Sequence, residues 1–148
     1  MKLYLDACCY NRPFDDQFLD RIRVEAEAVL AILGRVALDE WQLLGSEALD
    51  LEVSRCPDVE RRVRVLHLIA LVSRSVQVDE AVAQRSHELV GLGLHTFDAL
   101  HVACAETGGA GVFLTTDDRV LRWAARHKAR LSIRIANPAE WFAEATRQ

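Results

Sequence analysis

Two adjacent aspartates, Asp117 and Asp118, follow a short apolar run and two threonines, Thr115 and Thr116. Carboxylates this close repel each other, and no basic residue stands directly before them. One interpretation is that a helix begins here, because the first turn of a helix favours acidic side chains. The other is that a cation, such as a metal ion, binds beside the pair.

Further carboxylates are expected near the same place. Asp6 follows a strand predicted at residues 2–5, and Asp117 follows a strand predicted at residues 112–115. Ligands of parallel sheets gather beyond the carboxyl ends of the strands, so these two carboxylates are expected to converge at one edge. Asp98 lies in the first turn of a predicted helix, from which it could point to the same edge.

The helix predicted to follow Ser46 offers two glutamates, Glu47 and Glu52. Five residues correspond to about 140° around a helix, so the two side chains cannot both face inward. The residues three or four positions from Glu52 are mostly apolar, whereas Glu47 has more polar neighbours. We therefore select Glu52 for the site and keep Glu47 as a possible supporting residue.

Clustered carboxylates raise one another's pKa unless a cation joins them. A set of oxygen ligands without His or Cys suits Mg²⁺, or Mn²⁺, better than zinc. A site of this kind can hydrolyse phosphodiesters, because the metal activates water and stabilises the leaving oxygen. Acidic residues also cap helices without any further role, so the spacing alone leaves both interpretations open.

Composition limits the other possibilities. With 148 residues, 51% of them apolar, the chain is expected to form a single domain (residues 1–148) with a sizeable core. It has no apolar run long enough to cross a membrane and no signal-peptide pattern, so we expect a cytoplasmic protein. The four cysteines lack metal-site spacing and are expected to be reduced.

The charge is unevenly distributed. The formal net charge is −4, yet residues 119–134 contain six basic side chains and no acidic one. Such a stretch is either a solvated helix face or a surface that contacts a phosphate backbone.

Short apolar runs alternate with helical patterns along the chain. Strands are predicted at 2–5, in the later half of 35–44, and at 75–78, 112–115 and 131–135, and residues 11–16 are predicted as a loop. Helices are predicted at 16–33 (ended by Gly34), 46–55, from 58, at 79–92, from a cap at Thr96, at 117–127, and from 138. This order predicts an α/β three-layer sandwich, with a parallel sheet of four or five strands and helices on both faces.

Three segments together resemble the PIN-domain family, small metal-dependent nucleases that include toxins of bacterial toxin–antitoxin pairs. They are YLDACCYNRPFDD at the start, SEALDLEV in the middle, and FDALHVACAE followed by GVFLTTDDRVL near the end. The resemblance runs from Leu3 to the last helix. It implies that the metal-binding acids are Asp6, Glu52, Asp98 and Asp117, supported by Thr115 or Thr116 with Asp118 nearby.

The resemblance also implies a function. It points to a Mg²⁺-dependent endoribonuclease of the toxin type, with RNA as substrate, a small antitoxin as partner and a homodimeric assembly. Two alternatives stay open: a catalytically silent PIN-like module that binds RNA or a protein, and a metal-dependent phosphoesterase acting on DNA or small substrates.

One departure from the family pattern concerns the residues after the first aspartate. Family members commonly have Ser or Thr there, followed by Asn or Ser, whereas this chain has Ala7 and Cys8. Asn11 and Arg12 are the candidates to replace the missing polar contacts, and the departure leaves room for weaker activity.

Overall fold

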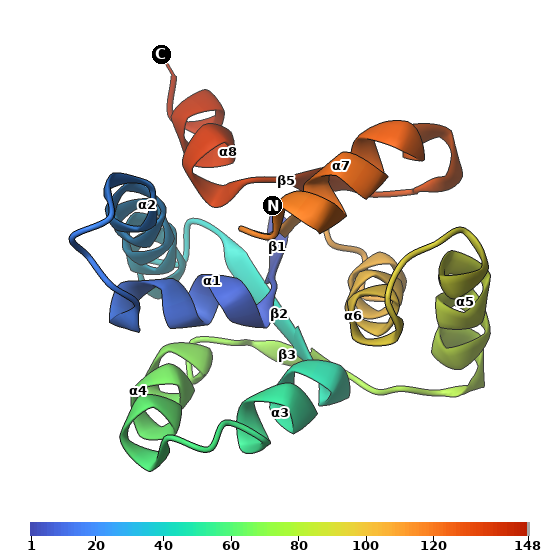
Figure 1. Cartoon of the computed structure of the whole chain (residues 1–148), viewed down its shortest axis with the longest axis horizontal. Helices are drawn as coiled ribbons and strands as arrows, with labels where there is room; N and C mark the ends of the chain where they lie inside the picture. Colours follow the sequence, from blue (N-terminus) through green and yellow to red (C-terminus); the bar gives the residue numbers. More distant parts are fainter. Residues whose placement is uncertain (148) are drawn as a thin grey trace.

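The computed structural model describes residues 1–147 and centres on one parallel sheet (Figure 1). Its strands are β1 (Lys2–Leu5), β2 (Gln42–Ser46), β3 (Arg74–Val76), β4 (Val112–Leu114) and β5 (Arg134–Ala136). They lie in the order β3-β2-β1-β4-β5, and every neighbouring pair is parallel. β1 is therefore central, with β2 and β4 on its two sides, so the ends of these three strands share one edge.

Helices cover both faces of the sheet, which confirms the predicted three-layer α/β fold (Figure 1). Alternation along β1 sends Leu3 and Leu5 into one core and Tyr4 into the other. The first core is covered by α1 (Ala7–Asn11), α2 (Asp20–Ala37), α4 (Val59–Ile69) and α8 (Pro138–Ala145). The second is covered by α5 (Glu80–Gly91), α6 (Thr96–Thr107) and α7 (Asp118–Arg126). The remaining helix, α3 (Glu47–Ser54), contributes to both cores.

Side-chain caps begin several helices where the sequence predicts them. Ser46 accepts a hydrogen bond from the backbone N–H of Leu49 at the start of α3, and Asp58 caps α4 in the same way. Asn137 caps α8, whose first residue is Pro138. No helix within residues 1–147 combines the length and the apolar character that a membrane crossing requires.

The predicted loop at residues 11–16 is wrong. Its first residue ends α1, and a 3-10 helix follows at Arg12–Phe14. The helix α1 forms because Asp6 caps it, with Oδ1 accepting a hydrogen bond from the N–H of Ala7 at 2.8 Å. The chain turns into a helix immediately after β1, so Asp6 is fixed at the junction.

Several other predicted boundaries differ from the structure. Gly34 does not end α2, because buried residues continue beyond it to Val36. This helix begins at Asp20 rather than at residue 16, and Phe18, which lies within the predicted helix, precedes α2 and is 94% exposed. The residue that caps α6 is His95 rather than Thr96. The last strand begins at Arg134, three residues later than predicted, because the chain bends at Ser132 and Ile133 before it pairs with β4.

A buried carboxylate connects the helices of the first face. Glu25 in α2 is 2% exposed, and its side chain accepts hydrogen bonds from Arg12, Arg21 and Asn137 at 2.9, 3.3 and 2.6 Å. Arg21 also donates to both carboxylate oxygens of Asp118, at 2.7 and 2.8 Å. Glu25 thus links α2 to the start of α8 and, through Arg21, to the start of α7.

Replacing Glu25 by Gln should lower the free energy of unfolding by about 2 kcal/mol, because hydrogen bonds to a charged group are lost. Urea unfolding measures this change. The matched control is Glu60→Gln, which breaks the exposed pair with Arg64 and should cost below about 1 kcal/mol. Equal costs for the two variants would contradict the role assigned to Glu25.

Candidate functional site

Asp6 stands at the carboxyl end of the central strand and is 6% exposed. Its Oδ1 accepts the capping hydrogen bond of α1, and its Oδ2 accepts a hydrogen bond from Thr115 Oγ1 at 3.0 Å. Burial raises the pKa of Asp6, and the charge of Glu52 raises it further, against the opposing effects of His101 and these hydrogen bonds. The fold therefore holds this carboxylate rigidly in a place that disfavours its charge.

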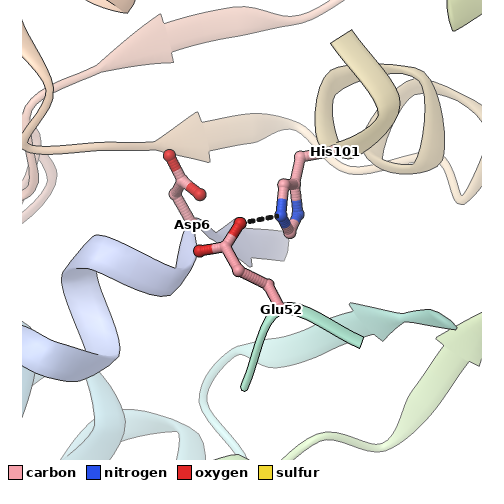
Figure 2. A group of neighbouring side chains, drawn as sticks. All are labelled: Asp6, Glu52 and His101. Carbon is pink, nitrogen blue, oxygen red and sulfur yellow. Dashed lines mark hydrogen bonds and ion pairs between the residues drawn. The ribbon is translucent and has the colours of Figure 1, made fainter. Parts of the chain in front are cut away.

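Glu52 points from α3 toward the same edge and meets His101 of α6 (Figure 2). The His101 Nε2 and Glu52 Oε1 atoms form a hydrogen bond of 3.0 Å. The nearest ligand atoms of Asp6, Glu52 and His101 all lie within 4.8 Å of one another. Two carboxylates from different elements and one imidazole thus converge on a single point.

His101 is fully buried and has a partner on each ring nitrogen. Its Nδ1 hydrogen-bonds the hydroxyl of Tyr4 at 2.6 Å, and that hydroxyl also hydrogen-bonds Ser46 Oγ at 2.6 Å. Burial lowers the pKa of His101, but the hydrogen bond to Glu52 and the neighbouring carboxylates outweigh it, and the pKa is raised overall. A chain of hydrogen bonds therefore runs from Ser46 through Tyr4 and His101 to Glu52.

His101 was not among the residues predicted for the site. Its position in the sequence could have indicated it, because residues three apart on a helix share a face, and His101 lies three positions after Asp98. Its contact with Tyr4 joins residues 97 positions apart, which no local pattern reveals.

Asp98 lies in the first turn of α6 and is half-buried. Burial raises its pKa to about 6, and the charges of Asp6 and Asp117 contribute to the rise. Within residues 1–147 its carboxylate accepts no hydrogen bond and forms no ion pair, and Glu52 Oε2 is equally free. Two carboxylates at this edge thus keep oxygens available for a further partner.

The aspartate doublet divides into two roles. Asp117 caps α7 by accepting a hydrogen bond from the N–H of Arg119, and the Arg119 side chain pairs with it. Although partial burial acts in the opposite direction, these contacts lower the pKa of Asp117. Asp118 is exposed and turns away to Arg21, which lowers its pKa. Of the two adjacent aspartates, Asp117 is the one whose charge raises the pKa of Asp98. Asp118 is an acidic residue of the first turn of α7, paired with Arg21.

Thr115 and Cys8 support the loop that carries Asp117. Thr115 Oγ1 donates to Asp6 and accepts a hydrogen bond from the N–H of Asp117 at 3.1 Å. Cys8 Sγ lies 3.3 Å from Thr115 Oγ1 and accepts from the N–H of Thr116 at the same distance. Cys8 thus supplies polar contacts after the first aspartate, although the sequence analysis expected them to be missing.

Three other candidates for supporting roles are engaged elsewhere. Asn11 lines a small cavity with Glu52, but its amide donates to the carbonyl of Ala7 and its Oδ1 accepts from Arg61. Arg12 binds Glu25 and Asp15. Glu47 is exposed and accepts a hydrogen bond from the N–H of Val78 at 2.6 Å. Asn11 and Arg12 therefore do not replace the contacts after Asp6.

The four carboxylates, hereafter the acidic cluster, are Asp6, Glu52, Asp98 and Asp117. The ligand atoms of Asp6 and Glu52 lie within 4.8 Å of each other and of His101. Asp98 is linked to them by charge, because its pKa is raised by burial and then by the charges of Asp6 and Asp117. Within residues 1–147, Glu52 and Asp98 retain free acceptor oxygens. The mutual repulsion that raises the pKa of Asp98 is relieved by a cation. These features fit a hard divalent ion such as Mg²⁺ or Mn²⁺.

The raised pKa of Asp98 predicts a pH-dependent effect of Asp98→Asn. The folded chain binds this proton more tightly than the unfolded chain, so stability falls as the pH rises from the ordinary pKa of 3.8 to about 6. In EDTA the variant should exceed the parent by about 1 kcal/mol at about pH 8, after allowance for solvent screening, and by less at about pH 4. Urea unfolding at both pH values measures this.

The control for that experiment is Asp50→Asn, which changes an exposed aspartate of α3. Its effect should be the same at both pH values. An advantage of Asp98→Asn that grows toward low pH would contradict the raised pKa.

No protein-family model and no curated protein matches this chain, but solved structures share its fold. A chain of VapBC2 from Rickettsia felis, bound to a promoter DNA fragment, aligns with 93% of this chain and 98% of its own, with a TM-score of 0.61 and 15% identity. DNA-bound VapBC from Salmonella typhimurium gives 0.56 at 16% identity, and VapBC-1 from nontypeable Haemophilus influenzae gives 0.57 at 14%, with the same coverage. The chain therefore has the three-layer, PIN-like α/β fold that its motifs predict.

Proposed function

We propose that the chain is a Mg²⁺-dependent endoribonuclease and the toxin of a toxin–antitoxin pair. The observation that supports this most directly is the convergence of Asp6, Glu52 and His101 at the carboxyl edge of the sheet, beside Asp98, whose pKa is raised by burial and by the charges of Asp6 and Asp117. The fold adds support, because the structures that share it are VapBC toxin–antitoxin structures.

The acidic cluster would hold the cation, with Mn²⁺ as an alternative to Mg²⁺. When bound, the ion would activate a water molecule for attack on an RNA phosphodiester and stabilise the leaving oxygen.

The chain's own residues orient the ligands. His101 Nε2 forms a hydrogen bond of 3.0 Å with Glu52 Oε1, and the Tyr4 hydroxyl forms one of 2.6 Å with His101 Nδ1, so Tyr4 orients Glu52 through His101. Thr115 fixes Asp6 and, through the N–H of Asp117, the loop between β4 and α7. Groups of this kind, which position ligands without touching the metal, commonly affect metal affinity and activity by about 10–100-fold.

The proposal includes the partners of the protein. We propose RNA as the substrate, a small antitoxin as the inhibitor and a homodimer as the assembly. We also propose that the protein acts in the cytoplasm.

The first test is cleavage of a mixed RNA pool by the purified chain, freed of any antitoxin, in Mg²⁺, Mn²⁺ or EDTA. We expect cutting in the two metals and none in EDTA. Asp98→Asn should reduce the cleavage rate by more than about 100-fold, because it removes a proposed metal ligand rather than a residue that only positions a ligand. The control is Asp50→Asn, on the exposed side of α3, which should cut like the parent.

Other outcomes distinguish the alternatives. Cleavage of DNA or small phosphoesters in preference to RNA would replace the ribonuclease by another metal-dependent phosphoesterase. A well-folded chain that cuts neither nucleic acid, yet binds RNA or a protein, would be a silent module.

The hydrogen-bond chain behind Glu52 predicts the effect of Tyr4→Phe. The variant keeps the ring that stacks on Phe113 and removes only the hydroxyl bound to His101. Mn²⁺ affinity, measured by titration calorimetry, should fall by about tenfold, because Glu52 loses its fixed orientation. Tyr10→Phe is the matched control, since the buried Tyr10 hydroxyl has no partner within residues 1–147. Equal affinities of the two variants would rule out the positioning role.

A further inference from the structure

Arg119 covers Asp117, the member of the acidic cluster that pairs with an arginine. Its Nε lies 3.4 Å from Asp117 Oδ1 and its Nη2 lies 3.2 Å from Asp117 Oδ2. The Arg119 side chain is 66% exposed, so the pair is screened by water and weak. The guanidinium can therefore leave Asp117 at little cost, which frees Oδ2, while Oδ1 keeps the capping hydrogen bond from the backbone N–H of Arg119 at 2.9 Å.

A cation held by the acidic cluster competes with Arg119 for these oxygens. A guanidinium displaced from Asp117 stays tethered beside the cluster by the first turn of α7. The N–H groups of the Arg119 guanidinium would then be free to donate hydrogen bonds to a phosphate bound at the acidic cluster. Arginine binds phosphate in a bidentate manner more readily than any other side chain, because its donors match two oxygens at once.

Two further arginines form a row with Arg119 along the exposed face of α7. Arg122 and Arg126 lie within about 60° of Arg119 around the helix, and the three span about 10 Å along it. Both are exposed, and within residues 1–147 no carboxylate lies within ion-pair distance of either. Because Asp117 caps α7, the row starts at the acidic cluster and leads away from it. It has the charge that an RNA backbone requires, on a chain that is otherwise acidic.

We propose that Arg119 exchanges partners when substrate binds: it pairs with Asp117 in the free protein and with the RNA phosphate at the acidic cluster in the loaded protein. Arg122 and Arg126 contact the phosphates that follow along the strand. This inference rests on the proposed ribonuclease function and adds the path of the RNA and a residue that contacts the reacting group.

The exchange predicts opposite effects of Arg119→Ala on metal and on RNA. Mn²⁺ affinity, measured by calorimetry without RNA, should rise by about two- to fivefold, because Asp117 loses a competing partner. RNA affinity should fall, because a phosphate contact is lost. A fall in Mn²⁺ affinity would instead mean that Arg119 positions Asp117 for the metal, which overturns the proposal.

RNA binding is measured with a short labelled single-stranded RNA in Ca²⁺ over a range of salt concentrations, and a gel checks that the RNA stays intact. Each lost phosphate contact lowers the slope of log affinity against log salt by about 0.7 for a single strand. We expect this decrease for Arg119→Ala, Arg122→Ala and Arg126→Ala separately. The matched control is Arg64→Ala, an exposed helical arginine paired with one carboxylate, and its slope should not change.

Two outcomes separate this inference from the function on which it rests. If the parent chain cuts RNA but Arg119→Ala keeps the parental slope, Arg119 is only a capping partner of Asp117 and the inference fails alone. If the parent chain neither binds nor cuts RNA, the proposed function fails and the exchange fails with it.

Discussion

The repulsion among four carboxylates at one edge of the sheet is the constraint on which the rest of the site depends. The parallel arrangement of β1, β2 and β4 brings the ends of these strands together, and Asp6 follows the central one. Burial of Asp6 makes the repulsion costly, as its raised pKa indicates. Every other polar feature at this edge either orients a carboxylate or offsets its charge.

Compensation comes from two basic side chains in very different settings. His101 lies in the core, with both ring nitrogens hydrogen-bonded, so it cannot move without breaking a chain that reaches Ser46. Arg119 lies at the surface and holds Asp117 through a weak, exposed pair. His101 thus lies on the buried side of the acidic cluster and Arg119 on its solvent side.

The positions that the sequence could predict depend on local rules. Asp6 and Asp117 follow apolar strands, and the rule for parallel sheets places such residues at a common edge. Glu52 could be chosen over Glu47 by helical periodicity, and the structure does send the two side chains to different partners. The fold class was predictable for the same reason, because alternation of strands and helices depends on short-range patterns.

The features that the sequence could not predict depend on contacts between distant residues. Tyr4 and His101 meet across 97 positions, and Arg21 and Asp118 meet across the same separation. Gly34 would end an isolated helix, but burial of Val36 continues α2 beyond it. Cys8 looks apolar in sequence, yet its sulfur receives the N–H of Thr116 only because α1 folds back against the β4–α7 loop. Tertiary packing decides each of these cases.

The two adjacent aspartates show how one local pattern can serve both structure and chemistry. Asp118 is bound by Arg21 through two short contacts, and Arg21 is itself anchored by the buried Glu25 and the carbonyl of Thr116. Asp117 is bound by Arg119 through longer contacts and no such anchor. The first pair fixes the start of α7 against α2, and that fixed start allows the second pair to open without moving the helix. Adjacent like charges are therefore tolerated here because each has its own arginine, Arg119 for Asp117 and Arg21 for Asp118.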